Sequence, residues 1–204
     1  DYRPMWEELG LDLDAHDALL NVLNQGYGDI YLSQQNRPET MGYFDFVMSE
    51  VHGLRIRELL DEKDQGRKIV GSYCVFVPEE IVLAAGATLV GLCSGADFAL
   101  EEVENRLPRN TCALIKSSFG FKLGKVCPYL ECADMIVGEN TCDGKKKAYE
   151  TFSSLVENLY VMDLPQVKSD PGKALLAAEF DRFRQAMEHL TGKPITAESL
   201  KYGI

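Results

Sequence analysis

The chain has 204 residues, of which 46% are hydrophobic and 26% are charged, and its formal net charge is −11. This composition is enough for one sizeable core, or for one domain with a helical appendage. A nucleic-acid-binding protein would normally carry a basic patch, and the densest basic run here, Lys145–Lys147, is too short to form one. We therefore expect no nucleic-acid partner.

The sequence also argues against export and membrane insertion. No apolar run reaches the roughly 18 residues that suggest a membrane span. The first residues, DYRPMWEELG, lack the basic and apolar regions of a secretory signal. We expect a cytoplasmic protein, and in a reducing compartment clustered cysteines bind metals or carry redox chemistry more often than they form disulfides.

Apolar spacing predicts a helical start to the chain. Apolar residues recur at spacings of three and four over residues 14–32 and 41–63, with a turn at NRPET between them. The period then changes to that of short buried strands. Helices are expected at about 78–87, with Pro78 in the first turn, at 96–107 and 143–157, and from Asp170 to Gly192. Strands are expected at 68–73, 88–93, 133–140 and 158–165.

Short apolar strands that alternate with helices predict an α/β fold. We expect a flavodoxin-like, doubly wound parallel sheet of about four strands, preceded by an N-terminal helical segment. The predicted organisation has three parts. They are a helical segment that packs on the core (1–66), an α/β domain (67–195) and the start of a further element (196–204).

Cysteines gather where this topology places a ligand site. The carboxyl ends of parallel strands share one edge, and Cys74, Cys93 and Cys142 follow the first three predicted strands. With Asn110 as a helix N-cap, Cys112 lies in the first turn of a helix. Helix N-termini favour the thiolate, the form that binds metals, so these cysteines can converge on one site.

The remaining cysteines are less simple. Cys132 precedes the third strand, near the opposite edge, and is expected to be a buried structural thiol. A full helix after Cys112 would carry Cys127 away from the site, whereas a shorter helix with a return loop would bring it back. A small core residue is also the simpler interpretation of Cys93. No CxxC pair supports a zinc knuckle, and no phosphate-loop signature is present. Lys116 and Lys145–Lys147 fit solvated helix faces.

Four stretches resemble one known family. They are GSYCVFVPEEIVLAAGATLVGLC, LPRNTCALIKSSFGFKL, CPYLECADMIVGENTCDGKKKAYE and VMDLP. They resemble the 2-hydroxyacyl-CoA dehydratase D-component/benzoyl-CoA reductase family, and most of all its double-cubane cluster protein branch. The resemblance implies two flavodoxin-like domains with an oxygen-sensitive iron–sulfur cluster, [4Fe-4S] or double-cubane, between them. It also implies low-potential electrons from an ATP-hydrolysing iron–sulfur activator, which allow a small substrate to be reduced or dehydrated.

The resemblance also names residues and partners. Cys112 and Cys142 match the cluster ligands of the first domain, Cys127 matches a cysteine typical of the double-cubane branch, and Cys74 matches another recurrent cysteine. Cys93 also matches a recurrent position but is a weaker candidate ligand than these four. The resemblance also implies a second domain or subunit of the same family, and a homodimer or heterodimer is expected.

By ordinary domain sizes the chain is about half of such a protein. Residues 196–204 would then begin a linker to the second domain. The expectation is an incomplete or empty cluster site and little activity in this part alone. The alternative is a non-catalytic, truncated α/β scaffold whose thiols are structural or bind zinc.

Overall fold

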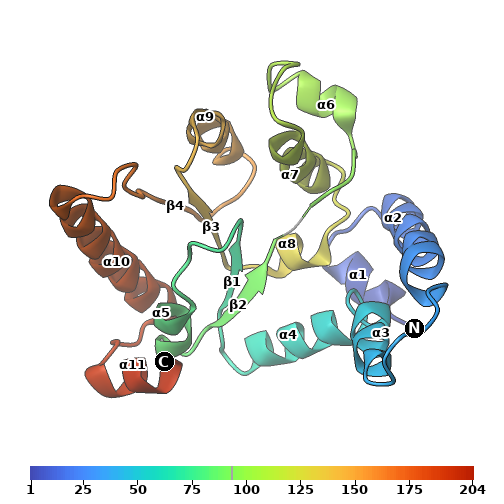
Figure 1. The fold of residues 1–204 in the computed structure, drawn as a ribbon, viewed down its shortest axis with the longest axis horizontal. Coiled ribbons are helices and arrows are strands. Elements are labelled where there is room, and N and C mark those ends of the chain that lie inside the picture. The colour runs from blue at the N-terminus through green and yellow to red at the C-terminus, as the bar shows by residue number, and fades with distance from the viewer. Residues whose placement is uncertain (93) are drawn as a thin grey trace.

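The computed structural model describes residues 1–92 and 94–204, and a parallel sheet lies at its centre (Figure 1). In this described part the sheet has four strands in the order β2-β1-β3-β4. The strands are β1 (Ile69–Ser72), β2 (Thr88–Gly91), β3 (Met135–Glu139) and β4 (Leu159–Met162). All neighbouring pairs are parallel. The predicted flavodoxin-like α/β class is confirmed.

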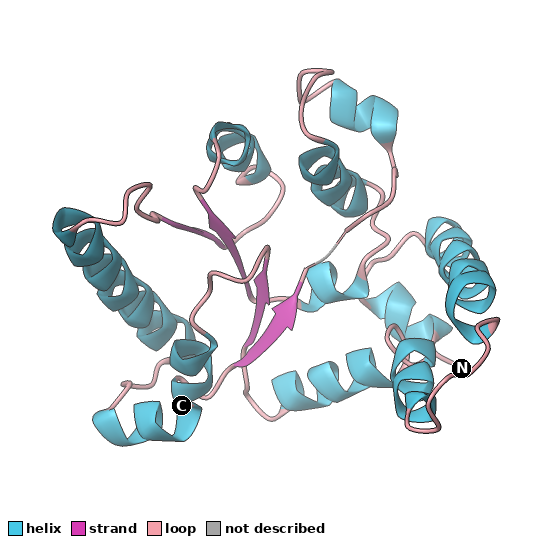
Figure 2. Cartoon of the chain, in the orientation of Figure 1, coloured by secondary structure: helices cyan, strands magenta, loops and turns pink. Residues whose placement is uncertain are grey.

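Helices cover both faces of the sheet, as a doubly wound fold requires (Figure 2). One face carries α5 (Glu79–Ala84), α10 (Asp170–Thr191) and α11 (Ala197–Gly203). The other carries α4 (Leu54–Asp64), α7 (Ala113–Leu123), α8 (Pro128–Cys132) and α9 (Asp143–Phe152), with the short α6 (Leu100–Glu104) beside α7.

Alternation along the strands produces these two layers. Val70 packs in the cluster that contains Phe183 and Met187 of α10, whereas its neighbour Ile69 packs with Ile56 and Leu59 of α4. Every residue of β1 and β3 is buried, as is usual for central strands of a parallel sheet.

The N-terminal segment is helical, as predicted, but more divided. It contains α1 (Arg3–Glu8), α2 (Leu13–Tyr27), the π-helix η1 (Gly28–Leu32) and α3 (Met41–Ser49). The expected single helix over 41–63 is wrong, because the chain breaks between α3 and α4. Glu50 accepts hydrogen bonds from the Tyr2 hydroxyl (2.7 Å) and the Leu54 amide (3.1 Å), which holds the break. A Cβ on Gly53 would lie 2.3 Å from the Tyr2 ring, so the turn requires glycine.

Three other helix boundaries differ from the prediction. Pro78 is the N-cap of α5 and not a residue of its first turn. The helix expected over 96–107 is limited to α6, because the preceding loop runs against α7: a Cβ on Gly120 would lie 2.1 Å from the Phe98 carbonyl oxygen. The helix expected to reach residue 157 ends at Phe152, where the Ser153 and Ser154 hydroxyls donate to backbone carbonyls of the last turn.

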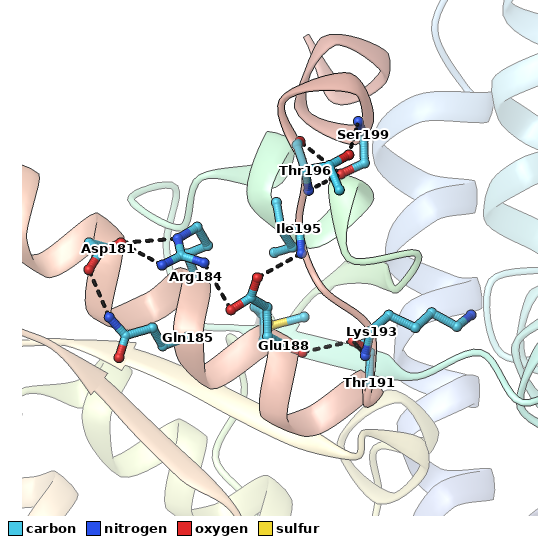
Figure 3. Close-up of polar contacts among 10 residues, drawn as sticks. Asp181, Arg184, Gln185, Glu188, Thr191, Lys193, Ile195, Thr196 and Ser199 are labelled. Atoms are coloured by element: carbon cyan, nitrogen blue, oxygen red, sulfur yellow. Dashed lines mark hydrogen bonds and ion pairs between the residues drawn. The ribbon is translucent and has the colours of Figure 1, made fainter.

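The C-terminal helices form a compact corner (Figure 3). After Gly192, which has a left-handed φ of 68°, the Ile195 amide donates to Glu188 Oε1 at 2.7 Å. Thr196 and Ser199 then form a capping box that begins α11. A Cβ on Gly203 would lie 2.6 Å from the Glu80 carbonyl oxygen, so α11 packs tightly on α5. No helix in the described residues has both the length and the apolar character needed to cross a membrane.

Candidate functional site

Three of the predicted thiols line one cavity at the carboxyl edge of the sheet. Cys74, Cys112 and Cys142 surround a volume of about 290 Å³. Its other walls are aromatic and aliphatic side chains, two serines and one lysine: Tyr73, Leu92, Ser94, Leu114, Ile115, Ser118, Phe119, Lys145, Ala148, Tyr149 and Phe152. All three thiols are exposed. The topology therefore brings together residues separated by as many as 68 positions in the sequence.

Two of these thiols cap helices that begin at this edge. Cys142 is the N-cap of α9, and its Sγ accepts a hydrogen bond from the Lys145 amide at 3.4 Å. Cys112 is the N-cap of α7, without a side-chain capping bond. The expectation that Asn110 would cap this helix is wrong by two residues. Both cysteines therefore stand at a helix N-terminus, where the first backbone N–H groups have no partner within the helix.

Cys74 reaches the cavity from the loop after β1. Its backbone has a φ of 79°, in the left-handed region that a residue with a side chain rarely adopts. Such a conformation costs on the order of 1–3 kcal/mol and persists where the surrounding structure enforces it, often at functional sites. The Ser72 hydroxyl donates to the Cys74 carbonyl at 3.4 Å and supports this turn.

Cys127 lies in a separate and much smaller cavity beside the first. Tyr73, Leu92 and Ser94 line both cavities and stand between them. The 11-residue α7 and a short return loop bring Cys127 back toward the site, where it is the buried N-cap of α8. This matches the shorter-helix alternative. Cys112, Cys127 and Cys142 thus each begin a helix.

The other two cysteines differ from these. Cys132 is the last residue of α8 and is fully buried against β1, β2 and α4, as expected of a structural thiol. Burial raises the pKa of Cys132 to about 12, so it stays protonated near neutral pH. Cys93, which was predicted to follow the second strand, lies outside the described residues.

A buried carboxylate borders the thiol cavity. Glu139, the last residue of β3, is 1% exposed. Its Oε1 forms an ion pair with the Lys145 ammonium and accepts a hydrogen bond from the Thr141 hydroxyl at 3.0 Å. Its Oε2 accepts from the Tyr149 hydroxyl at 3.3 Å. The charge is therefore both paired and hydrogen-bonded, as burial demands.

Two tyrosines complete the polar lining, and both remain neutral donors. Burial raises the pKa of Tyr149, and the adjacent Glu139 carboxylate raises it further. Burial likewise raises the pKa of Tyr73, with smaller contributions from Cys127 and Tyr149. Tyr73 also packs edge-on against Phe152, with ring centroids 5.9 Å apart. Both phenols line the cavity, and the single Tyr149 O–H is donated to Glu139.

The candidate ligands of this cavity are its three cysteines. Among residues 1–92 and 94–204, no three His, Cys, Asp or Glu side chains are close enough to hold one metal ion. The cavity instead spaces three thiols around its wall. Thiolates are the usual ligands of iron–sulfur clusters, whose iron atoms are bound at separate corners. The thiols around this cavity therefore fit an iron–sulfur cluster as partial ligands.

Sequence reasoning missed part of the site. Lys145 was assigned with Lys146 and Lys147 to a solvated face, but it is half-buried and paired, whereas its two neighbours are exposed. A glutamate that ends an otherwise apolar strand, six residues before a lysine in the first turn of a helix, was the available signal. The helix α8 was also missed, although Pro128 directly after Cys127 is a typical helix start.

Comparisons with known proteins identify the family of this chain. The family model for the 2-hydroxyglutaryl-CoA dehydratase D-component matches residues 74–204. The dehydratase subunit YjiM of Escherichia coli (strain K12) is 45% identical over 157 residues, 76% of this chain and 41% of that protein. The (R)-phenyllactyl-CoA dehydratase beta subunit of Clostridium sporogenes is 30% identical over 142 residues, 68% of this chain and 37% of that protein.

A third relative, a benzoyl-CoA reductase subunit of Thauera aromatica, is 28% identical over 148 residues, 70% of this chain and 37% of that protein. The chain thus spans about two fifths of the length of the curated relatives it matches. All three relatives carry names of subunits, which indicates that family members work in assemblies of several components. The matched residues include all three thiols of the thiol cavity and the strands β2, β3 and β4. The chain belongs to the 2-hydroxyglutaryl-CoA dehydratase D-component family.

Proposed function

We propose that this chain is the first α/β domain of an iron–sulfur dehydratase or reductase that acts on a small substrate such as a CoA thioester. The observation that carries the proposal is the single cavity lined by Cys74, Cys112 and Cys142. The names of the relatives, which include two dehydratase subunits and a benzoyl-CoA reductase subunit, support the substrate class.

In this proposal the three thiolates hold one side of the cluster, and Cys127 adds a ligand if the cluster extends toward the second cavity. The bound cluster would supply one-electron transfer at low potential. The chain's own residues set the surroundings of that cluster. The Lys145 amide at the start of α9 donates to the Cys142 sulfur, and Tyr149 and Lys145 line the same cavity.

The apolar part of the wall has a separate task. Phe119 and Phe152 are almost fully buried and pack edge-on, with ring centroids 5.0 Å apart. Together with Ile115 and Leu92 they keep water from the sheet side of the cavity. A dry, low-dielectric wall strengthens each nearby charge and hydrogen bond.

The remaining components are proposed by analogy with the family. Further cluster ligands and the substrate pocket would come from a second domain or subunit, in a homodimer or heterodimer. Electrons would come from an ATP-hydrolysing iron–sulfur activator. We also propose a division into a helical segment (1–66), a cluster-binding domain (67–195) and the start of a linker (196–204).

Metal analysis of protein purified without oxygen tests this function. The complete gene product should contain iron and acid-labile sulfide in nearly equal amounts and show iron-dependent visible absorbance that oxygen bleaches. One tightly bound zinc per chain without such absorbance would instead identify the non-catalytic scaffold and refute the proposal. Iron content must be compared with a Cys132→Ser control, because Cys132 is fully buried and lines neither the thiol cavity nor the smaller one.

A further inference from the structure

The side chains that bond to Glu139 come from both sides of Cys142 in the sequence. The three donors to Glu139, Thr141, Lys145 and Tyr149, all lie within the ten residues that follow Glu139. Cys142 lies between the first two donors in the sequence. Lys145 contacts both groups, since its amide donates to Cys142 Sγ at 3.4 Å while its ammonium pairs with Glu139. One carboxylate therefore tethers the loop before Cys142 and the helical turn after it.

Stability alone does not explain this network. A lysine in the first turn of a helix opposes the positive end of the dipole, so Lys145 is unfavourable there unless its charge is neutralised. A buried ion pair is in turn no more stabilising than well-packed apolar residues of similar size, because both charges lose their hydration. An apolar residue at the end of β3 and a neutral one at position 145 would satisfy the fold. The pair is therefore better explained by what it orders.

We propose that Glu139 and Lys145 are the positioning pair of Cys142. Glu139 anchors the Lys145 side chain, Lys145 offers its amide to the Cys142 sulfur, and the ammonium is held at the wall of the thiol cavity. The inference rests on the proposed function, in which Cys142 is a cluster ligand. A cluster held by several thiolates is anionic, so a fixed ammonium and an N–H donor on the same sulfur both favour its reduced state.

The first test measures alkylation of Cys142 in the metal-free chain. Iodoacetamide is added under anaerobic conditions at one fixed neutral pH, and modification is followed by mass spectrometry with Cys112 as the internal reference. Lys145→Met should slow the modification of Cys142 roughly fivefold, because the Lys145 amide that donates to the Cys142 sulfur is no longer held by the ion pair with Glu139. Lys145→Arg, which keeps the charge and can still pair with Glu139, should restore a rate near that of the native chain.

This readout separates positioning from a merely structural role. If the substitution only loosened the loop, the sulfur would become more accessible and alkylation would accelerate. An unchanged or faster rate in Lys145→Met, or a slow rate that Lys145→Arg does not restore, would overturn the inference.

The second test addresses Glu139 by hydrogen exchange. Glu139→Gln keeps the size of the side chain but cannot pair with the ammonium, so amides of residues 140–147 should exchange about tenfold faster. Glu179→Gln is the matched control. Glu179 is 4% exposed, accepts a hydrogen bond from Tyr160 (2.8 Å) and pairs with Arg182 on α10, on the other face of the sheet. The anchoring role would be contradicted if amides 140–147 exchanged at native rates in Glu139→Gln. Equal acceleration of the same amides in Glu179→Gln would contradict it too.

Both measurements use the chain without metal, so they can fail independently of the proposed function. Cys142→Ser tests the function itself, by loss of the cluster. A cluster that survives Cys142→Ser refutes the ligand assignment even where alkylation slows as expected. A cluster that is lost in Cys142→Ser, with alkylation unchanged in Lys145→Met, refutes only the positioning pair.

Discussion

The buried His16 and the half-buried His52, between the N-terminal helices and α8, should make the fold sensitive to acid. The imidazoles of His16 and His52 stack with centroids 5.0 Å apart, flanked by the rings of Trp6 and Tyr129. His16 Nδ1 donates to the Val126 carbonyl at 2.8 Å. Within the described chain, His16 Nε2 and His52 Nδ1 are buried without a hydrogen-bond partner. Protonation would therefore place charge in poorly hydrated surroundings, which Asp17 offsets only in part and only for His16.

The sign and size of the effect follow from the pKa values. Burial, and to a lesser extent the neighbouring His16, lowers the pKa of His52 from 6.5 to about 4. Burial also lowers the pKa of His16. Between pH 6.5 and 4 the histidines of the unfolded chain are protonated while those of the folded chain stay neutral. The free energy of unfolding therefore falls as the pH drops through this range. For His52 alone the free energy of unfolding should fall by about 2 kcal/mol by pH 5, and by about 3 kcal/mol once the pH is below 4.

Guanidinium unfolding near neutral pH and near pH 5 measures this loss. His52→Phe keeps an aromatic ring in the stack but cannot bind a proton, so it should remove most of the difference of about 2 kcal/mol that His52 contributes. His189→Gln, at an exposed position on α10, is the control and should leave the difference unchanged. An equally large loss between the two pH values in the native chain and in His52→Phe would refute the reasoning.

Three further predictions follow from close contacts, thiol burial and helix capping. Gly138→Ala should destabilise the chain by about 1–3 kcal/mol in denaturant unfolding, because its Cβ would lie 2.3 Å from the Tyr149 ring. Gly91→Ala, with nothing within 4 Å, should have a much smaller effect. Near pH 8, Cys132 should resist alkylation in the native chain while the three thiols of the large cavity react, and equal labelling measured by mass spectrometry would contradict its burial. Ser169→Ala removes the hydroxyl that caps α10 through the Gly172 amide (3.2 Å) and should cost about 1 kcal/mol in the same unfolding assay; no loss would show that solvent replaces the cap.

The sheet could be predicted because its signal is local. All four expected strands exist, although β1, β3 and β4 are shorter at both ends and β2 at its C-terminal end. The buried runs of β1 and β3 are characteristic of a parallel sheet. Helix boundaries were less predictable, because distant contacts set them. The break after α3 depends on Tyr2, and the short α6 depends on the approach of Phe98 to Gly120. Periodicity along one segment contains no information about such contacts.

The site was predictable where topology alone decides. The rule that parallel strands end at one edge, with the helix start at Cys112, predicted that four thiols could converge: Cys74, Cys93, Cys112 and Cys142. Cys93 lies outside the described residues, and the other three line one cavity. Topology could not separate Cys127 into its own cavity, since that depends on the length of α7 and on the Tyr73 side chain between the cavities. Nor did topology reveal that Lys145 pairs with Glu139; the only sequence signal for this pair was the glutamate that ends an apolar strand.

The central claim is that the thiols of this cavity bind an iron–sulfur cluster, and loss of single thiols tests it most directly. The complete gene product is reconstituted anaerobically with iron and sulfide, reduced, and examined by electron paramagnetic resonance alongside Cys112→Ser, Cys142→Ser and Cys132→Ser. The account predicts a cluster signal that is lost or strongly altered in the first two variants and unchanged in Cys132→Ser. A native signal in either Cys112→Ser or Cys142→Ser would contradict it.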